Sequence, residues 1–205
     1  LKNLQPITMA PTEAETIADG HVHIRGLVRN KGAKVPRGFI TVASQAGTSH
    51  EIPEGHSGRL ELAEWITDPQ HPLTSRVMVN RIWKYLLGEG IVRTVDNFGK
   101  TGELPSHPKL LDHLAIQFTE NNWSIKSLIR EIVLSKTYRQ QSIFSDQNPG
   151  VRKDTANRLL WRQNPRRMDA ETIRDSVLLV SGKLNDQTGG PGFEDFAYKQ
   201  AYAPE

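Results

Sequence analysis

The sequence contains no cysteine among its 205 residues. This absence excludes disulfide bonds, zinc–thiolate sites, iron–sulfur clusters, covalently attached c-type haem and a cysteine nucleophile from the chain. No run approaches the ~18 consecutive apolar residues of a membrane-spanning helix, and no basic-then-apolar signal sequence opens the chain. The formal net charge of +3 is too small to require a nucleic acid or an acidic membrane as partner.

The rest of the composition is typical of a folded domain. Hydrophobic residues make up 37% of the chain and charged residues 24%, a balance that disfavours wholesale disorder. The length suits one domain with a small appendage. The first residue is Leu1 rather than methionine, so we interpret the sequence as a piece of a longer protein.

The first 56 residues predict a small β-like N-terminal extension. His21–Arg25 alternates polar and apolar residues at the period of a half-buried strand, and Phe39–Ala43 is a second strand candidate. The polar, glycine-bearing segment 29–34 between them predicts a turn, so we expect a short hairpin.

From residue 57 the apolar residues recur at helical spacing, which predicts a mainly α fold. We expect an irregular bundle of about six helices in a helical domain over residues 57–192, followed by an aromatic tail over residues 193–205. The expected helices cover about 59–67, 74–87, 108–120, 125–133, 156–161 and 165–184. The residues Ser124 and Pro108 are typical of helix starts, and the glycines at 88 and 189–190 of helix ends.

One polar cluster is the first candidate for a ligand or partner surface. It lies beside the apolar face of the second expected helix and in the glycine-rich loop after it, and consists of Arg76, Asn80, Arg81, Asp96 and Asn97. These side chains suit a ligand cleft. They suit equally well the hydrogen bonding of loop backbone that packing has buried.

A second candidate is a charged stripe on the last expected helix. Arg167, Glu171, Arg174 and Asp175 follow one another at offsets that bring them to one helix face. Two carboxylates one turn apart between two arginines are typical of an acid/base pair, and also of an intrahelical ladder of ion pairs.

The seven histidines do not predict a metal site. His21 and His23 would share one strand face, with His50 and His56 near in sequence, but no HExxH or similar spacing occurs. We therefore expect no metal in this chain.

Basic residues are concentrated in residues 126–175, which hold 11 basic and 6 acidic side chains, and eight of the 11 are arginines. This bias is weaker than that of specific DNA-binding domains. We expect these arginines to join helices through carboxylates and carbonyl groups, and we do not expect nucleic acid as a partner.

Several motifs together resemble a known family. They are LTSRVMVNRIW at 73–83, GEGIVRTVDNFG at 88–99, GELPSHP at 102–108, SKTYRQ at 135–140 and NRLLWR at 157–162. The sequence is similar to the C-terminal domain of unknown function of the large secreted proteins of planctomycete type, often called PSD proteins. The resemblance extends over roughly residues 22–192.

The resemblance implies an exported, multidomain protein. Relatives carry a cytochrome-c-like segment at the N-terminus, a second domain of unknown function and sometimes a lectin-like module. It therefore implies an extracytoplasmic location and other domains of the same polypeptide as partners. The resemblance implies that any haem lies elsewhere in the full-length protein, and we expect no cofactor in this chain. The resemblance identifies no catalytic residues in this sequence.

We expect a structural or interaction module, with carbohydrate as the candidate ligand. The alternative is a polysaccharide-acting hydrolase or oxidoreductase component that uses two of Asp96, Asp112, Glu171 and Asp175 as acid and base. Two of these carboxylates in one pocket at about 5 to 10 Å, the separations of glycoside hydrolases, would favour the enzyme.

Overall fold

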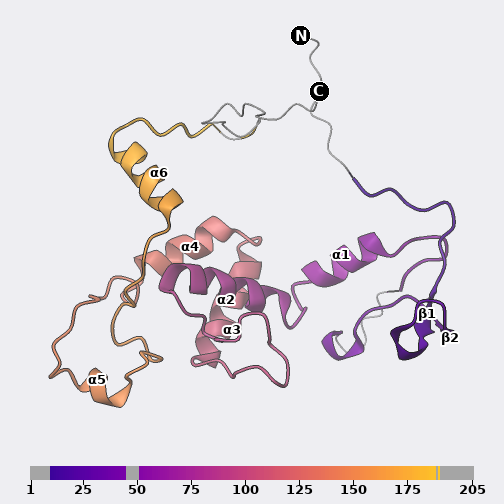
Figure 1. The fold of residues 1–205 in the computed structure, drawn as a ribbon, viewed down its shortest axis with the longest axis horizontal. Coiled ribbons are helices and arrows are strands. Elements are labelled where there is room, and N and C mark those ends of the chain that lie inside the picture. The colour runs from indigo at the N-terminus through magenta and orange to yellow at the C-terminus, as the bar shows by residue number, and fades with distance from the viewer. Residues whose placement is uncertain (1–9, 45–50, 188, 190–205) are drawn as a thin grey trace, which may run out of the picture. The chain divides into compact units, whose positions relative to one another are not determined.

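The computed structural model describes residues 10–44, 51–187 and 189. The described residues form six α-helices and one two-stranded sheet, so the prediction of a mainly helical fold with a small β extension is confirmed (Figure 1). The elements are β1 (Gly20–His23), β2 (Lys31–Val35), α1 (Arg59–Thr67), α2 (Thr74–Leu87), α3 (Pro108–Glu120), α4 (Ile125–Leu134), α5 (Pro149–Lys153) and α6 (Ala170–Val180). The chain divides into two compact units, residues 1–164 and 165–205, and each is described by itself.

Three helices build the buried core of the first unit. The helix α2 lies against both α3 and α4, and α3 against α4 (Figure 1). Their inward apolar residues form one cluster: Val79, Ile82, Trp83, Leu87, Ile91, Val92, Leu111, Leu114, Ala115, Phe118, Leu128 and Ile132. Each large side chain buried in this way contributes about 1.5 to 3 kcal/mol.

The helices α3 and α4 pack against each other and are joined by a short connection. The helix α3 ends at Glu120, and Asn122 and Trp123 both take left-handed backbone conformations that reverse the chain. Ser124 then caps α4 by accepting a hydrogen bond from the Ser127 backbone N–H at 3.3 Å. The cap satisfies one of the N–H groups that a helix start leaves without a partner.

The predicted hairpin is wrong in its second strand. The strand β1 pairs antiparallel with β2, so the segment expected as a turn supplies the partner strand, and Thr41–Ala43 is a 3₁₀ turn. Arg25 and Gly26 both have positive φ and reverse the chain directly after β1. The reversal brings the next segment alongside β1 before the chain reaches residue 39.

The prediction of a helix over 156–161 is also wrong. The helix α5 ends at Lys153, and the residues after it fold around the side chain of Asn157, which is 2% exposed. Its Nδ2 donates to the Arg162 carbonyl at 2.8 Å and to Asn164 Oδ1 at 2.9 Å. A side chain that binds backbone in this way competes with the helical ladder, and Asn157 itself has a φ of 52°.

The last helix is shorter than the predicted span of 165–184. Asp169 caps α6 by accepting from the Thr172 N–H at 2.7 Å, and hydrogen bonds from the Thr172 side chain and backbone lower the pKa of Asp169. At the other end Gly182 has a φ of 67°, and the Lys183 N–H donates back to the Leu178 carbonyl at 2.8 Å. Both ends follow ordinary capping chemistry.

The junction between α1 and α2 is held by one histidine. The His71 ring lies edge-on against Trp65 at a centroid distance of 4.5 Å, and Trp65 is the buried residue of α1. His71 Nδ1 accepts from the Thr74 backbone N–H at 3.2 Å and lies 2.9 Å from Thr74 Oγ1. The proton of the neutral ring therefore lies on Nε2, which is buried without a hydrogen-bond partner in the described residues.

We predict that replacing Asn157 by alanine lowers the free energy of unfolding by about 3 kcal/mol. The hydrogen-bond partners of the Asn157 side chain become unsatisfied, and a left-handed backbone conformation costs alanine more free energy than asparagine. Urea denaturation measures the change. Asn122→Ala is the matched control, because Asn122 also has positive φ but is exposed, and we expect about 1 kcal/mol there. Equal losses in the two variants would contradict this account of Asn157.

We predict that stability decreases as the pH falls from 7 to 5, in part through His71. Burial lowers the pKa of His71 below its ordinary 6.5, although Asp68 partly opposes this shift. Below pH 6.5 the unfolded chain therefore binds a proton that the folded chain excludes. Denaturation across this range should show a smaller decrease for His71→Gln than for the wild-type protein. An unchanged slope for His71→Gln would contradict the assignment.

Candidate functional site

The five residues of the predicted polar cluster lie on α2 and on the loop that follows it, but they face different surroundings. Asn80 lies fully buried in the core. Its Oδ1 accepts from the Val92 N–H and its Nδ2 donates to the Val92 carbonyl, both at 2.9 Å. The amide thus pairs with both polar groups of one buried backbone residue and fixes the loop onto α2. Gly90 has no Cβ to clash with this amide, since a Cβ there would approach both Asn80 amide atoms to 2.9 Å.

Arg76 ties α2 to α3. Its Nε donates to Asp112 Oδ1 at 2.7 Å, and its Nη1 donates to the Pro72 carbonyl at 2.6 Å. The guanidinium therefore has two protein partners, and Asp112 is engaged in the same ion pair.

The remaining three residues of the cluster meet at one groove. Arg81 Nη2 lies 3.1 Å from Asp96 Oδ1, and the Asp96 side chain is 87% exposed. The groove has a volume of about 340 Å³ and is lined by Leu73, Val77, Arg81, Val95, Asp96, Asn97, Phe98 and Gly99. The groove thus brings together residues of α2 and of the loop, and its surface contains one ion pair, one amide and one aromatic ring.

The loop beneath the groove is held by its own hydrogen bonds. Asn97 Oδ1 accepts from the Gly99 N–H at 3.0 Å, and its Nδ2 donates to Thr101 Oγ1 at 3.0 Å. The hydroxyl of Thr94 donates to the Asn97 carbonyl at 2.8 Å and accepts from the Glu103 N–H at 2.9 Å. These hydrogen bonds fix the conformation of the loop backbone from which the exposed Asp96 side chain extends.

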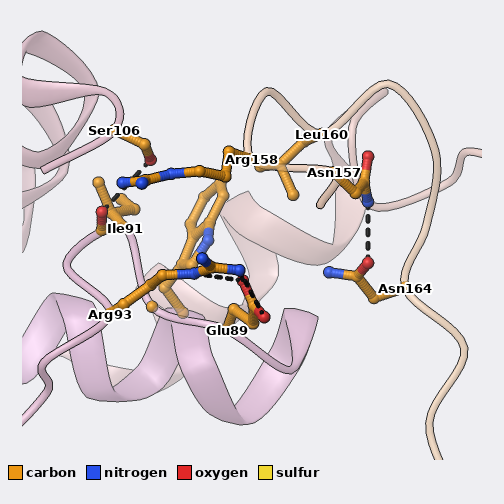
Figure 2. A pocket seen from close by; sticks show the side chains of 10 residues that line it. Glu89, Ile91, Arg93, Ser106, Asn157, Arg158, Leu160 and Asn164 are labelled. Atoms are coloured by element: carbon orange, nitrogen blue, oxygen red, sulfur yellow. Dashed lines mark hydrogen bonds and ion pairs between the residues drawn. The ribbon is translucent and has the colours of Figure 1, made fainter. Parts of the chain in front are cut away.

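A smaller, polar pocket is lined by other residues of the same loop, Glu89, Ile91 and Arg93 among them. Figure 2 shows Arg93 bound to Glu89 and Asn157 hydrogen-bonded to Asn164. Arg158, from the segment after α5, also lines this pocket. Arg93 binds the Glu89 carboxylate at 2.8 to 3.0 Å, and this hydrogen bond raises the pKa of Arg93. The volume of about 20 Å³ admits one water-sized molecule, so the pocket is too small for a sugar or a cofactor.

The second predicted stripe belongs to the second unit. Arg167 precedes the helix, because the Asp169 cap starts α6 at Ala170. On the helix, Arg174 Nη1 lies 3.7 Å from the carboxylate of the adjacent Asp175, and Glu171 occupies the first turn. The four side chains therefore do not share one helix face.

The carboxylates proposed as acid and base are distributed between the two units. Asp96, Asp112 and Asp175 each lie within ion-pair distance of an arginine. Asp96 is the one carboxylate that lines the groove between α2 and its loop. Among the described residues, neither this groove nor the Figure 2 pocket combines two of the four candidate carboxylates.

The sequence analysis did not single out a further pocket, which lies between the segment before α5 and the residues after it. It contains Phe144, Trp161 and Arg162, together with several amide side chains. The adjacent Trp161 and Arg162 and the arginine-rich composition of the segment were the available signals. The pairing with Phe144 depends on a loop reversal that no spacing in the sequence indicates.

The part of the chain that the structure describes lacks two further classes of site. No three histidine, aspartate or glutamate side chains converge there in a metal-binding group. No helix there has the length and apolar character needed to cross a membrane.

We predict different stability effects for two neighbouring residues of α2. Asn80→Ala leaves the buried N–H and carbonyl of Val92 without partners and should lower the free energy of unfolding by about 3 kcal/mol. Arg81→Ala removes an exposed ion pair and should cost less than about 1 kcal/mol. Urea denaturation of both variants measures the difference. A cost for Arg81→Ala as large as that for Asn80→Ala would show that the groove residue also holds the fold.

Comparison with known proteins gives one match. No curated protein and no solved structure matches the chain. A family model does match residues 58–205, and its description is PSD1, protein of unknown function (DUF1553). The match covers most of the chain and includes α1 to α6. The chain therefore belongs to the PSD1 family of proteins of unknown function.

Proposed function

We propose that this domain is a non-catalytic binding module of an exported multidomain protein, and that it binds carbohydrate in the groove between α2 and its following loop. The observation that carries the proposal is the exposed Arg81–Asp96 ion pair beside Asn97 and Phe98. Its other partners would be further domains of the same polypeptide. The extracytoplasmic location rests on the sequence resemblance alone.

The chemistry of the groove suits sugar hydroxyl groups. A guanidinium donates hydrogen bonds and a carboxylate accepts them, so an Arg–Asp pair can bind two neighbouring hydroxyls, each of which donates and accepts. Phe98 packs partly on the core and lines the groove with its ring, which can cover the apolar face of a sugar ring. The volume of about 340 Å³ lies within the range of about 300 to 1,000 Å³ that is usual for small-molecule sites.

Binding without hydrolysis is favoured by the number of carboxylates at the groove. Glycoside hydrolysis ordinarily requires two carboxyl groups across the scissile bond. Asp96 is the one carboxylate among the described residues that line the groove, and it is paired with Arg81. The hydrolase alternative would need a second acidic side chain at this position.

A glycan array probed with the 205-residue protein tests the proposal. We expect binding to a defined set of glycans, reduced at least about tenfold by Arg81→Ala and by Asp96→Ala, because each change removes a charge-assisted hydrogen bond. Arg130→Ala on α4 is the matched control, since it removes an exposed arginine away from the groove. Circular dichroism should show that all three variants remain folded.

Two outcomes would contradict the proposal. Unchanged glycan binding by Arg81→Ala and Asp96→Ala would remove the groove from the ligand site. The absence of any glycan binding by the wild-type protein would favour a purely structural role between domains.

A further inference from the structure

The pocket around Trp161 is built on a fixed aromatic side chain. The Trp161 indole N–H donates to the Asp154 carbonyl at 2.9 Å, and one side of the ring packs on Gly150. Phe144 meets the ring edge to face at a centroid distance of 5.2 Å. The pocket has a volume of about 410 Å³ and is lined by Gln140, Gln141, Ile143, Phe144, Ser145, Asn148, Trp161 and Arg162.

Arg162 brings a positive charge to this pocket, and its Nη1 donates to the Gln163 carbonyl at 3.4 Å. Its guanidinium carbon lies 4.9 Å from the centre of the Phe144 ring and 5.3 Å from that of Trp161. It forms no ion pair with a carboxylate of the described residues, and its buried Nε has no hydrogen-bond partner there. The arginines Arg76, Arg81, Arg93 and Arg158 differ in this respect, since each is paired with an acidic side chain.

Amide groups with free hydrogen-bonding capacity surround this charge. Among the described residues the Gln141 side chain has no hydrogen-bond partner, and Asn148 uses only its Oδ1, which accepts from the Gly150 N–H. Gln140 uses its Nε2, which donates to the Leu160 carbonyl at 2.9 Å. The pocket therefore offers one cation, several neutral donors and acceptors, and the Phe144 ring, which is 42% exposed.

We infer that this pocket is a second binding site, separate from the groove, and that it takes an acidic sugar such as a uronic acid residue of a polysaccharide. The ligand carboxylate pairs with the Arg162 guanidinium, whose planar fork suits a two-point hydrogen bond. The amides of Gln141 and Asn148 bind the ring hydroxyls, and Phe144 covers the apolar face of the ring.

The charge distribution favours an acidic sugar over a neutral one. A neutral ligand that covered Arg162 would remove water from a guanidinium without supplying an opposite charge, and such desolvation is unfavourable. The surrounding segment 126–175 carries the basic surplus of the chain, which attracts anions. The volume of about 410 Å³ suits one or two sugar rings rather than a folded partner.

Isothermal titration calorimetry of the 205-residue protein with a trimer of galacturonic acid, and with the neutral trimer of galactose, tests the inference. We expect the acidic trimer to bind more tightly, and its affinity to fall as salt is raised. Arg162→Gln should weaken acidic-trimer binding at least about tenfold, the size of a lost charge-assisted contact. Arg130→Gln is the matched control and should leave the affinity unchanged.

A second variant keeps the test independent of folding, because Arg162 also packs on two aromatic rings. Gln141 is exposed and makes no side-chain hydrogen bond in the described residues, so Gln141→Ala should leave the fold intact and weaken the acidic trimer about threefold to tenfold. Arg81→Ala should weaken binding at the groove only, and Arg162→Gln binding in this pocket only, which separates a failure of the second site from a failure of the groove.

Three results would overturn the inference. They are equal affinity for the acidic and neutral trimers, unchanged acidic-trimer binding by folded Arg162→Gln or by Gln141→Ala, and equal or tighter binding of an acidic peptide or an oligonucleotide of the same charge. The last result would assign the pocket to another class of anionic ligand.

Discussion

The structure around the groove depends on the pair of hydrogen bonds between the Asn80 amide and the Val92 backbone. Asn80 lies on α2 within the core, and Val92 lies in the loop that leaves this helix. Without the pair, the loop could enter the core only by burying an N–H and a carbonyl that lack partners. With it, Ile91 and Val92 join the apolar cluster, and the loop residues on either side are held at the surface. The groove and the pocket of Figure 2 are both lined in part by this one anchored loop.

The arginines of the chain serve two different purposes. Arg76 and Arg93 are engaged with nearby carboxylates and backbone, and they stabilise the arrangement of α2, α3 and the loop. Arg81 is paired too, but its partner Asp96 is almost fully exposed, so a ligand can reach both members. Arg162 lies on aromatic rings without an acidic partner in the described residues. The partners of each arginine, and the exposure of those partners, distinguish residues that hold the fold from those that we assign to binding.

Local sequence signals predicted the elements that depend on local physics. The helices α1 to α4 follow from apolar spacing, a proline at a first turn and the Ser124 cap. The errors occur where one side chain redirects the backbone. Where a helix was predicted, the Asn157 side chain binds the backbone and closes a loop. Arg25 and Gly26 reverse the chain before the expected second strand. The predicted polar cluster is split for a different reason: the sequence places Asn80 and Arg81 side by side, but only the packing of α2 decides which one faces the core.

The most direct test of the carbohydrate site is a chemical-shift map of the ¹⁵N-labelled protein titrated with the neutral oligosaccharide that binds best on the glycan array. Asp96, Asn97, Phe98 and Gly99 line the groove, and their backbone amide signals should shift with a single saturating curve. The signals of Gln140, Gln141, Phe144 and Asn148, which line the Arg162 pocket, should remain unshifted by a neutral sugar. Saturable shifts confined to residues outside the groove would contradict the account.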